Sequence, residues 1–385
     1  MWKAVIRAYG SQKLATGTRR IGLGLLLAIA LAGAGTPAWG VSPTPTLVAQ
    51  LSDAQEERLN GLLRDARGQI DRKNYAAGIA TYQQALTIDR DNAQLYAAIG
   101  YLQILQQDFQ LAIESYRQAI DRDSRNLPFR YGLAHSLYKA GRDAEAADAY
   151  RAIIRMAPTE ADAHLGLGSL LLSQSRYDEA RTALEESARL APNNAQVYEA
   201  IGQLYLAQER YDEALAPLQR ALRQDSSRGT IHASLAKIWL HQGRNQEAEA
   251  ALRRAIAANA EDWESHYHLA ELLSARGERQ AAFNFYEEAA ETNPGFVPAQ
   301  AALGELLLER QQYTRAIISY QAIVRRFPDD AGARYNLGIA LWGNGRREAG
   351  LTYLEQARNL YDEQGSRSDV ERVEALMESL TAEVE

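Results

Sequence analysis

The sequence has no cysteine, and it contains only three methionines and six histidines among its 385 residues. The absence of cysteine excludes disulfide bonds, thiol catalysis and cysteine-ligated metals. The asparagines form no N-x-Ser/Thr sequon, so nothing indicates a glycosylated secreted domain. These absences are consistent with a bacterial envelope protein.

Motifs for catalysis and for cofactor binding are also missing. The sequence contains no H-E-x-x-H, no phosphate-binding loop, no G-x-S-x-G and no dinucleotide fingerprint. The run Gly166-Leu167-Gly168 is rich in glycine, but it falls inside a predicted helix. The sequence therefore predicts a protein that is not an enzyme and that binds no cofactor and no metal.

Residues 1–40 contain no acidic residue, and their basic residues are Lys3, Arg7, Lys13, Arg19 and Arg20. An apolar run from Ile21 to Ala34 follows, and then the short sequence Ala38-Trp39-Gly40. This order of features predicts a secretory signal peptide that is cleaved after Gly40. We therefore expect an exported protein of the periplasm, or of the thylakoid lumen in a photosynthetic cell.

An uncleaved membrane anchor is the alternative for the same residues 1–40. The stretch from Ile21 to Leu51 carries no charge, and one membrane span needs only about 20 such residues. Five glycines and three prolines in this stretch weaken a helix of that length. Under this alternative, the chain meets the membrane only through residues 1–40.

Without residues 1–40 the chain is strongly acidic. Five of its 42 basic residues are removed with that segment, which leaves 37 basic against 49 acidic residues. Nucleic-acid binding depends on clustered Lys and Arg that displace counterions from phosphates. The charge balance therefore predicts no nucleic-acid partner.

Residues 41–58 are predicted to be a linker and the start of the first helix. Pro43, Pro45 and several threonines favour an extended tether up to Leu51. Ser52 and Gln55 have the spacing of a capping box, in which each side chain bonds to the backbone N–H of the other residue. We therefore expect a helix to begin directly after Ser52.

A period of thirty-four residues organises the rest of the chain, from Leu59 to Gln364, in nine consecutive copies. The unit from Ala161 to Asn194 contains His164-x2-Leu167-Gly168-x2-Leu171, then Ala180-x3-Leu184, then Pro192. Its twentieth position is small in every copy: Gly78, Ala112, Ala146, Ala180, Ala214, Ala248, Ala282, Ala316 and Gly350. Its eighth position is also always Gly or Ala. Small residues at fixed positions indicate that two helices of each unit pack closely there.

This unit resembles the tetratricopeptide repeat, a helix–turn–helix of the same length. The resemblance implies an all-α, right-handed solenoid of nine tandem repeats over residues 59–364. Residues 365–385 are predicted to be a C-terminal capping helix, with Ser368 and Glu371 as its capping pair and apolar residues at helical spacing. Alternatively, this amphipathic stretch docks a partner or a second copy of the chain.

Three of the six histidines occupy the fourth position of their repeats, namely His164, His232 and His266. The family usually has a large aromatic residue at this position, so packing explains these histidines better than metal binding. His266 and His268 are two residues apart and therefore point to different faces of a helix.

The resemblance also implies that the first helices line a concave groove for a partner. The predicted binding residues in the first three repeats are Arg64, Arg67, Tyr101, Tyr131, His135, Tyr138 and Lys139. Those in the seventh and eighth repeats are Tyr267, Glu271 and Glu305. Tyrosine gives a large contact area at low entropic cost, which favours a binding role; the alternative is that these tyrosines only pack inside the repeats.

The sequence thus predicts a non-catalytic scaffold that binds a peptide segment or a partner protein, in the assembly of the bacterial envelope. The second hypothesis is an accessory subunit of an envelope enzyme or secretion complex, held at the membrane by its N-terminus. A clamp for chaperone C-termini is not predicted, because no Asn occupies a ninth position and the required Lys and Arg are missing.

Overall fold

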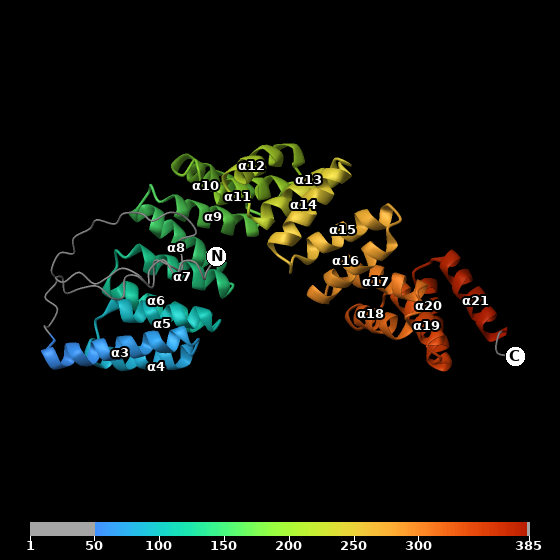
Figure 1. The fold of residues 1–385 in the computed structure, drawn as a ribbon, viewed down its shortest axis with the longest axis horizontal. Helices are drawn as coiled ribbons and strands as arrows, with labels where there is room; N and C mark the ends of the chain where they lie inside the picture. Colours follow the sequence, from blue (N-terminus) through green and yellow to red (C-terminus); the bar gives the residue numbers. More distant parts are fainter. Residues whose placement is uncertain (1–50, 383–385) are drawn as a thin grey trace. The chain divides into compact units, whose positions relative to one another are not determined.

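The computed structural model describes residues 51–382, which form nineteen helices and no strand (Figure 1). The predicted signal peptide, or anchor, lies outside these residues. The chain divides into two compact units at the bond between Ala200 and Ile201, inside helix α11 (Ala195–Ala207). No helix of the described part is long and apolar enough to cross a membrane.

The first unit consists of helix pairs that follow one another along the chain. Its first helices are α3 (Asp53–Asp71), α5 (Ala93–Leu105), α7 (Leu127–Lys139) and α9 (Ala161–Ser173), followed by the start of α11. Its second helices are α4 (Tyr75–Ile88), α6 (Phe109–Arg122), α8 (Asp143–Met156) and α10 (Tyr177–Leu190). Each of α4, α6 and α8 packs against the first helix of its own repeat and against that of the next, and α10 packs against α9.

The second unit repeats this arrangement after the end of α11. Its second helices are α12 (Tyr211–Gln224), α14 (Asn245–Ala258), α16 (Arg279–Thr292), α18 (Tyr313–Arg326) and α20 (Arg347–Glu363). Its first helices are α13 (Gly229–His241), α15 (Trp263–Ala275), α17 (Val297–Glu309) and α19 (Ala331–Gly343), and α21 (Arg367–Ala382) packs on α20 at the end. The prediction of an all-α solenoid of tandem helical repeats is confirmed.

The small residues lie where the sequence predicts close contact between two helices. Ala180 is fully buried, and Gly168 of the same repeat faces it across the helix pair. A Cβ on Gly168 would lie 2.7 Å from the Leu184 side chain and 3.3 Å from the Ala180 carbonyl oxygen. No side chain larger than hydrogen therefore fits at the eighth position of this repeat without movement of its neighbours.

The turn between the two helices of each repeat has one conformation throughout the described chain. The fifteenth residue has a positive φ in all nine repeats: Lys73, Gln107, Gly141, Ser175, Glu209, Gly243, Gly277, Gln311 and Gly345. Only four of these residues are glycine, the residue that adopts this conformation without strain. The sequence pattern therefore did not indicate the left-handed turn.

The helix cap predicted at the start of the described chain is present, and the one predicted near its end is not. Ser52 and Gln55 form the predicted capping box, with the Ser52 N–H nitrogen 3.0 Å from Gln55 Oε1 and the Gln55 N–H nitrogen 3.4 Å from Ser52 Oγ. The capping pair predicted at Ser368 is wrong. Helix α21 begins at Arg367, because the chain turns at Gly365 with φ 74° and the Ser366 hydroxyl then donates to Asp369 at 2.5 Å.

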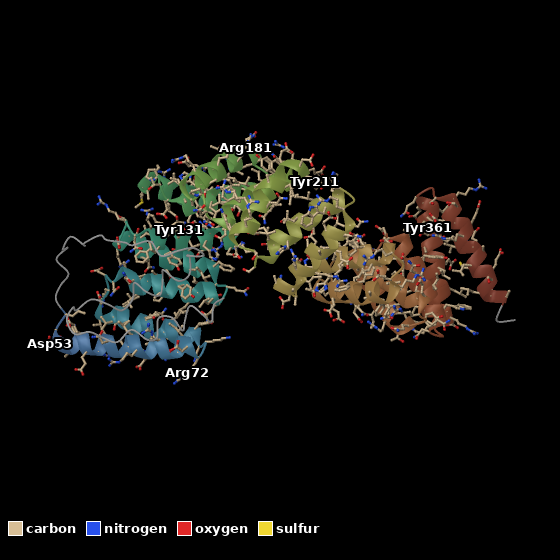
Figure 2. All side chains as sticks on the ribbon, turned by 45° about the horizontal axis from the view of Figure 1, so that its top comes forward. Asp53, Arg72, Tyr131, Arg181, Tyr211 and Tyr361 are labelled. Atoms are coloured by element: carbon tan, nitrogen blue, oxygen red, sulfur yellow. The ribbon has the colours of Figure 1, made fainter. Side chains whose placement is uncertain are left out.

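Helix α21 covers the last repeat through one buried residue and one arginine. Val373 is fully buried. The guanidinium carbon of Arg372 lies 4.9 Å from the ring centroid of Tyr335 and 5.8 Å from that of Tyr361, which Figure 2 labels near the C-terminal end. Glu371, Glu374 and Glu378 of α21 are exposed, and Glu374 lies 3.7 Å from Arg358 of α20.

Candidate partner-binding surface

All ten predicted binding residues lie on first helices. Arg64 and Arg67 lie on α3, Tyr101 is half-buried on α5, and four residues follow one another along α7, namely Tyr131, His135, Tyr138 and Lys139. Tyr267 and Glu271 lie on α15, and Glu305 lies on α17. The two sets belong to different units, and we describe each by itself.

Tyr131, which Figure 2 labels, is half-buried in the first unit. Its ring meets that of Tyr150 from α8 edge to face, with ring centroids 6.4 Å apart. Its hydroxyl is buried and makes no hydrogen bond within the described residues. Burial raises the pKa of Tyr131 well above its usual value, and the nearby carboxylates of Glu160 and Asp162 raise it further. Tyr131 therefore packs against Tyr150 and exposes only part of its side chain.

Tyr138 is the most accessible aromatic residue of this set. It is 44% exposed, and the Lys139 ammonium lies 5.9 Å from the centroid of its ring. Burial lowers the pKa of the neighbouring His135, and the positive charge of Lys139 lowers it further. His135 is therefore neutral at pH 7, so Lys139 supplies the positive charge at this end of α7.

Tyr101 belongs to the core between the first two repeats more than to a cluster with Tyr131 and Tyr138. It packs against the buried residues of α3, α4 and α5. Burial raises its pKa, and the neighbouring Tyr75 adds to the shift. Within residues 51–382, ring contacts join none of the three predicted tyrosines to one another. The sequence spacing places them on first helices, but it does not show which side each ring takes.

The acidic set of the second unit forms a connected group of side chains. The Tyr267 hydroxyl donates to Glu271 Oε1 at 2.8 Å, and His268 Nδ1 lies 3.2 Å from Glu271 Oε2. The hydrogen bond with His268 is the largest cause that lowers the pKa of Glu271, and the bond from Tyr267 adds to it, while burial acts in the opposite direction. Glu271 is therefore ionised at neutral pH and held in place from two sides.

Aromatic rings pack against Tyr267 of this group. The Tyr267 ring meets the Phe296 ring edge to face at 4.9 Å, and Phe296 also packs on Trp263 at 4.6 Å. Burial raises the pKa of Tyr286 to about 12, with further contributions from the carboxylates of Glu271 and Glu305. Both carboxylates therefore lie near the same phenol. The structure brings Tyr267 and Glu271 together as an aromatic and acidic pair, and Glu305 is exposed on α17, the next first helix.

The histidines at the fourth position of the repeats have a structural role that the sequence did not reveal. In each case Nε2 lies 3.0–3.1 Å from a backbone carbonyl oxygen six residues earlier, namely that of Pro158, Ser226 and Ala260. Arg130 and Arg334 donate from the same position to equivalent carbonyls. The side chain at this position thus ties the start of a first helix to the linker before it. Within residues 51–382, no three His, Asp or Glu side chains are grouped so that they could hold a metal ion.

Comparison with known proteins places this arrangement among helical repeats. A tetratricopeptide-repeat model described as the C-terminal domain of cilia and flagella-associated protein 70 matches residues 49–295, and a tetratricopeptide repeat model matches residues 301–368. A repeat-containing protein of Picosynechococcus sp. PCC 7002 is 41% identical over 68 residues, which are 18% of each chain. The matched segment thus spans less than a fifth of that relative.

Two solved structures show the same fold. A tetratricopeptide repeat protein of Parabacteroides merdae has a TM-score of 0.54 at 15% identity, over 66% of this chain and 99% of that one. A monomeric mutant of IFIT1, solved with Gppp-AAAA, has a TM-score of 0.50 at 17% identity, over 75% of this chain and 68% of that one. From its repeat period, its helix pairs and the models that match most of its length, this chain belongs to the tetratricopeptide repeat family.

Proposed function

We propose that this protein is a non-catalytic scaffold that binds a peptide segment or a partner protein on the surface formed by its first helices. The observation that carries the proposal is the pair of Tyr267 and Glu271, in which the Tyr267 ring and the Glu271 carboxylate are held in place by neighbouring side chains. Preorganised aromatic and charged residues are typical of binding surfaces, because little conformational entropy is lost on association.

The partner class follows from the charges of each unit. On the second unit, Glu271 and Glu305 favour a basic segment of the partner. On the first unit, Lys139, Arg64 and Arg67 favour an acidic one. IFIT1 was solved with Gppp-AAAA, but the excess of acidic residues in this chain after residue 40 favours a protein partner over a nucleic acid.

The proposed setting is the bacterial envelope, with export through residues 1–40. The alternative is a membrane-anchored accessory subunit, which is favoured by the uncharged stretch from Ile21 to Leu51. N-terminal sequencing of the protein purified from its own cells distinguishes these two: a start at Val41 supports the exported scaffold, and a start at Met1 supports the anchored subunit.

The binding surface can be tested once a partner has been purified by capture from an envelope extract. Tyr138→Ala and Glu271→Gln should each weaken its affinity, by about thirty-fold for a residue at the centre of the contact. Phe327→Ala is a matched control, because Phe327 is 46% exposed, like Tyr138, but follows a second helix. Equal affinity of all variants, with unchanged melting curves, would place the partner elsewhere on the chain.

A further inference from the structure

A hollow of about 840 Å³ lies between helices α8, α9 and α10 of the first unit. Its apolar lining comes from Ile154, Leu167, Leu171 and Ala183. Side chains of two second helices and of the first helix between them surround it, so it is distinct from the predicted binding residues on first helices. Its volume is in the range of ligand-binding pockets, about 300–1,000 Å³.

Seven of the twelve lining residues recur three repeats later in the chain, including the five described next. The residues in the first unit are Arg151, Ile154, His164, Leu167 and Leu171, and those at the same repeat positions in the second unit are Arg253, Ile256, His266, Leu269 and Leu273. All five residue types are identical. Five of the twelve lining positions differ between the two units, among them Glu179, which corresponds to Ala281. Only at Ala183, which corresponds to Phe285, does the second unit place an aromatic ring where the first unit has a small side chain.

Phe285 shows what this lining accommodates. Its ring centroid lies 5.7 Å from that of His266, and the guanidinium carbon of Arg253 lies 5.8 Å from the ring centroid. An aromatic ring is thus held between an imidazole and a cation, which favours a ring over an aliphatic side chain of similar size. Where the first unit has Ala183, that position supplies no ring to the corresponding Arg151 and His164.

The charged residues around the hollow form ion pairs with one another, including Arg151 of α8 with Glu179 of α10 at 3.9 Å. Arg151 is paired with Asp148 at 3.0 Å, and Arg189 with Glu186 at 2.6 Å. Arg253 is similarly paired with Glu249 at 2.9 Å while it lies over the Phe285 ring. An ion pair at the rim is therefore compatible with a ring below it.

We propose that the hollow between α8, α9 and α10 is a docking site for an aromatic side chain of a partner protein. The ring takes the position between Arg151 and His164 that Phe285 takes between Arg253 and His266. This site goes beyond the proposed function, because it lies mainly on second helices and does not depend on the predicted binding residues of the first helices. In the second unit the equivalent site is filled by Phe285 of the chain itself, so this unit shows how the site holds a ring.

The test uses the full chain and a short peptide, acetyl-Gly-Gly-(4-fluoro-Phe)-Gly-Gly-amide, observed by fluorine NMR at millimolar concentration. Wild-type protein should broaden and shift the fluorine signal, and Ala183→Phe should abolish this effect by filling the hollow from within. Arg151→Gln should weaken binding about two- to five-fold, since the cation over the ring is lost. The corresponding peptide with leucine should compete poorly.

A matched variant gives the opposite expectation. Phe285→Ala opens the equivalent hollow in the second unit, so it should add a second binding site for the same peptide. The combination of Ala183→Phe with Phe285→Ala should restore a single site. Circular dichroism checks that each variant is folded, and the Phe285→Ala result stands even where Ala183→Phe does not fold.

Three results would overturn the proposal. The first is a wild-type signal identical to that of free peptide, and the second is binding that Ala183→Phe leaves unchanged. The third is tighter binding of free 4-fluorophenylalanine than of the peptide, which would indicate a site for a small aromatic molecule. None of these results bears on the surface of the first helices, whose test uses different variants and a different partner.

Discussion

At the scale of single residues, the turn inside each repeat requires a left-handed backbone conformation. Five of the nine repeats adopt it with a residue other than glycine, which costs conformational energy. Gln107 has φ 65° and Gln311 has φ 59°, a conformation that costs a residue with a Cβ about 1–2 kcal/mol. We expect Gln107→Gly and Gln311→Gly to stabilise the protein by about 0.5–1 kcal/mol each, since the greater entropy of unfolded glycine offsets part of the gain. Urea unfolding monitored by circular dichroism measures this.

The control for these variants is Gly141, which already has glycine at the same turn position. A Cβ on Gly141 would meet no atom within 4 Å, so Gly141→Ala adds only backbone strain. It should therefore destabilise the protein by about 1 kcal/mol. If Gly141→Ala were neutral, left-handed strain at this turn would not be the reason for the gain expected at Gln107.

Substitutions at two other glycines, Gly61 and Gly168, separate the effect of helix propensity on stability from the effect of packing. Gly61 lies in α3, and a Cβ added to it would meet no atom within 4 Å, whereas a Cβ on Gly168 would lie 2.7 Å from Leu184. Both glycines are inside helices, where alanine is favoured by about 1 kcal/mol. We expect Gly61→Ala to stabilise the protein by about this amount and Gly168→Ala to destabilise it by about 1 kcal/mol, because the contact must open. Thermal melting of both variants decides whether packing outweighs propensity at Gly168.

The sequence predicts the position of a residue in the repeat better than it predicts the contacts of its side chain. Gly168 was correctly predicted as a close contact, because its position is small in every copy. The orientation of Tyr131 was not predictable, since its partner Tyr150 comes from the neighbouring helix α8. The group of Tyr267, Glu271 and Tyr286 similarly depends on ring positions that no spacing along one helix reveals.

At the scale of helices, α21 packs on α20 and buries one apolar residue, Val373. Val373 is fully buried although its neighbours on α21 are half-buried or exposed. We expect Val373→Ala to cost about 2 kcal/mol through the cavity it leaves. Hydrogen exchange should accelerate in α20 and α21. Glu371→Ala, which removes only an exposed ion pair with Arg367, should leave exchange in α20 unchanged.

One carboxylate joins two neighbouring repeats in a pH-dependent way. Glu249 of α14 lies 2.7 Å from Arg276 and 2.9 Å from Arg253. The hydrogen bond from Arg276 is the largest cause that lowers the pKa of Glu249 below its ordinary 4.5, and burial opposes it. A lowered pKa in the folded state stabilises the protein at pH values above 4.5, and this stabilisation is lost as the pH falls through the folded-state pKa.

We therefore expect Glu249→Gln to lower stability at pH 7 by about 1 kcal/mol or less, as for a partly exposed ion pair. The difference between variant and wild type should shrink as the pH is lowered below 4.5. Melting temperatures measured from pH 7 to pH 3 test this expectation. If the melting temperatures of variant and wild type differed by the same amount from pH 7 to pH 3, the packing of the Glu249 side chain, and not its charge, would explain its contribution to stability.

At the scale of the whole chain, the repeat period predicts the start of each helix from α5 to α20, because the two helices of every repeat pack on each other in the same way. The exceptions lie where this regularity ends. Helix α21 begins at Arg367, because it belongs to no helix pair of the period and the turn at Gly365 sets its start. The hollow beside Ala183 is a further exception, because it depends on a position where the first unit has Ala183 and the second unit has Phe285.

A chain of this kind should also lose stability locally, because each helix packs mainly on its neighbours in sequence. Leu337 is fully buried in α19, and Leu337→Ala should cost about 2–5 kcal/mol there. We expect amide exchange to accelerate at least about thirty-fold in α17 to α20, since each 1.4 kcal/mol corresponds to a factor of ten. Exchange in α3 to α6 should not change, because those helices pack on one another and on α7. A uniform acceleration over residues 51–382 would instead show that the nine repeats unfold as one cooperative body, and that the energy of a bound partner would be shared by all of them.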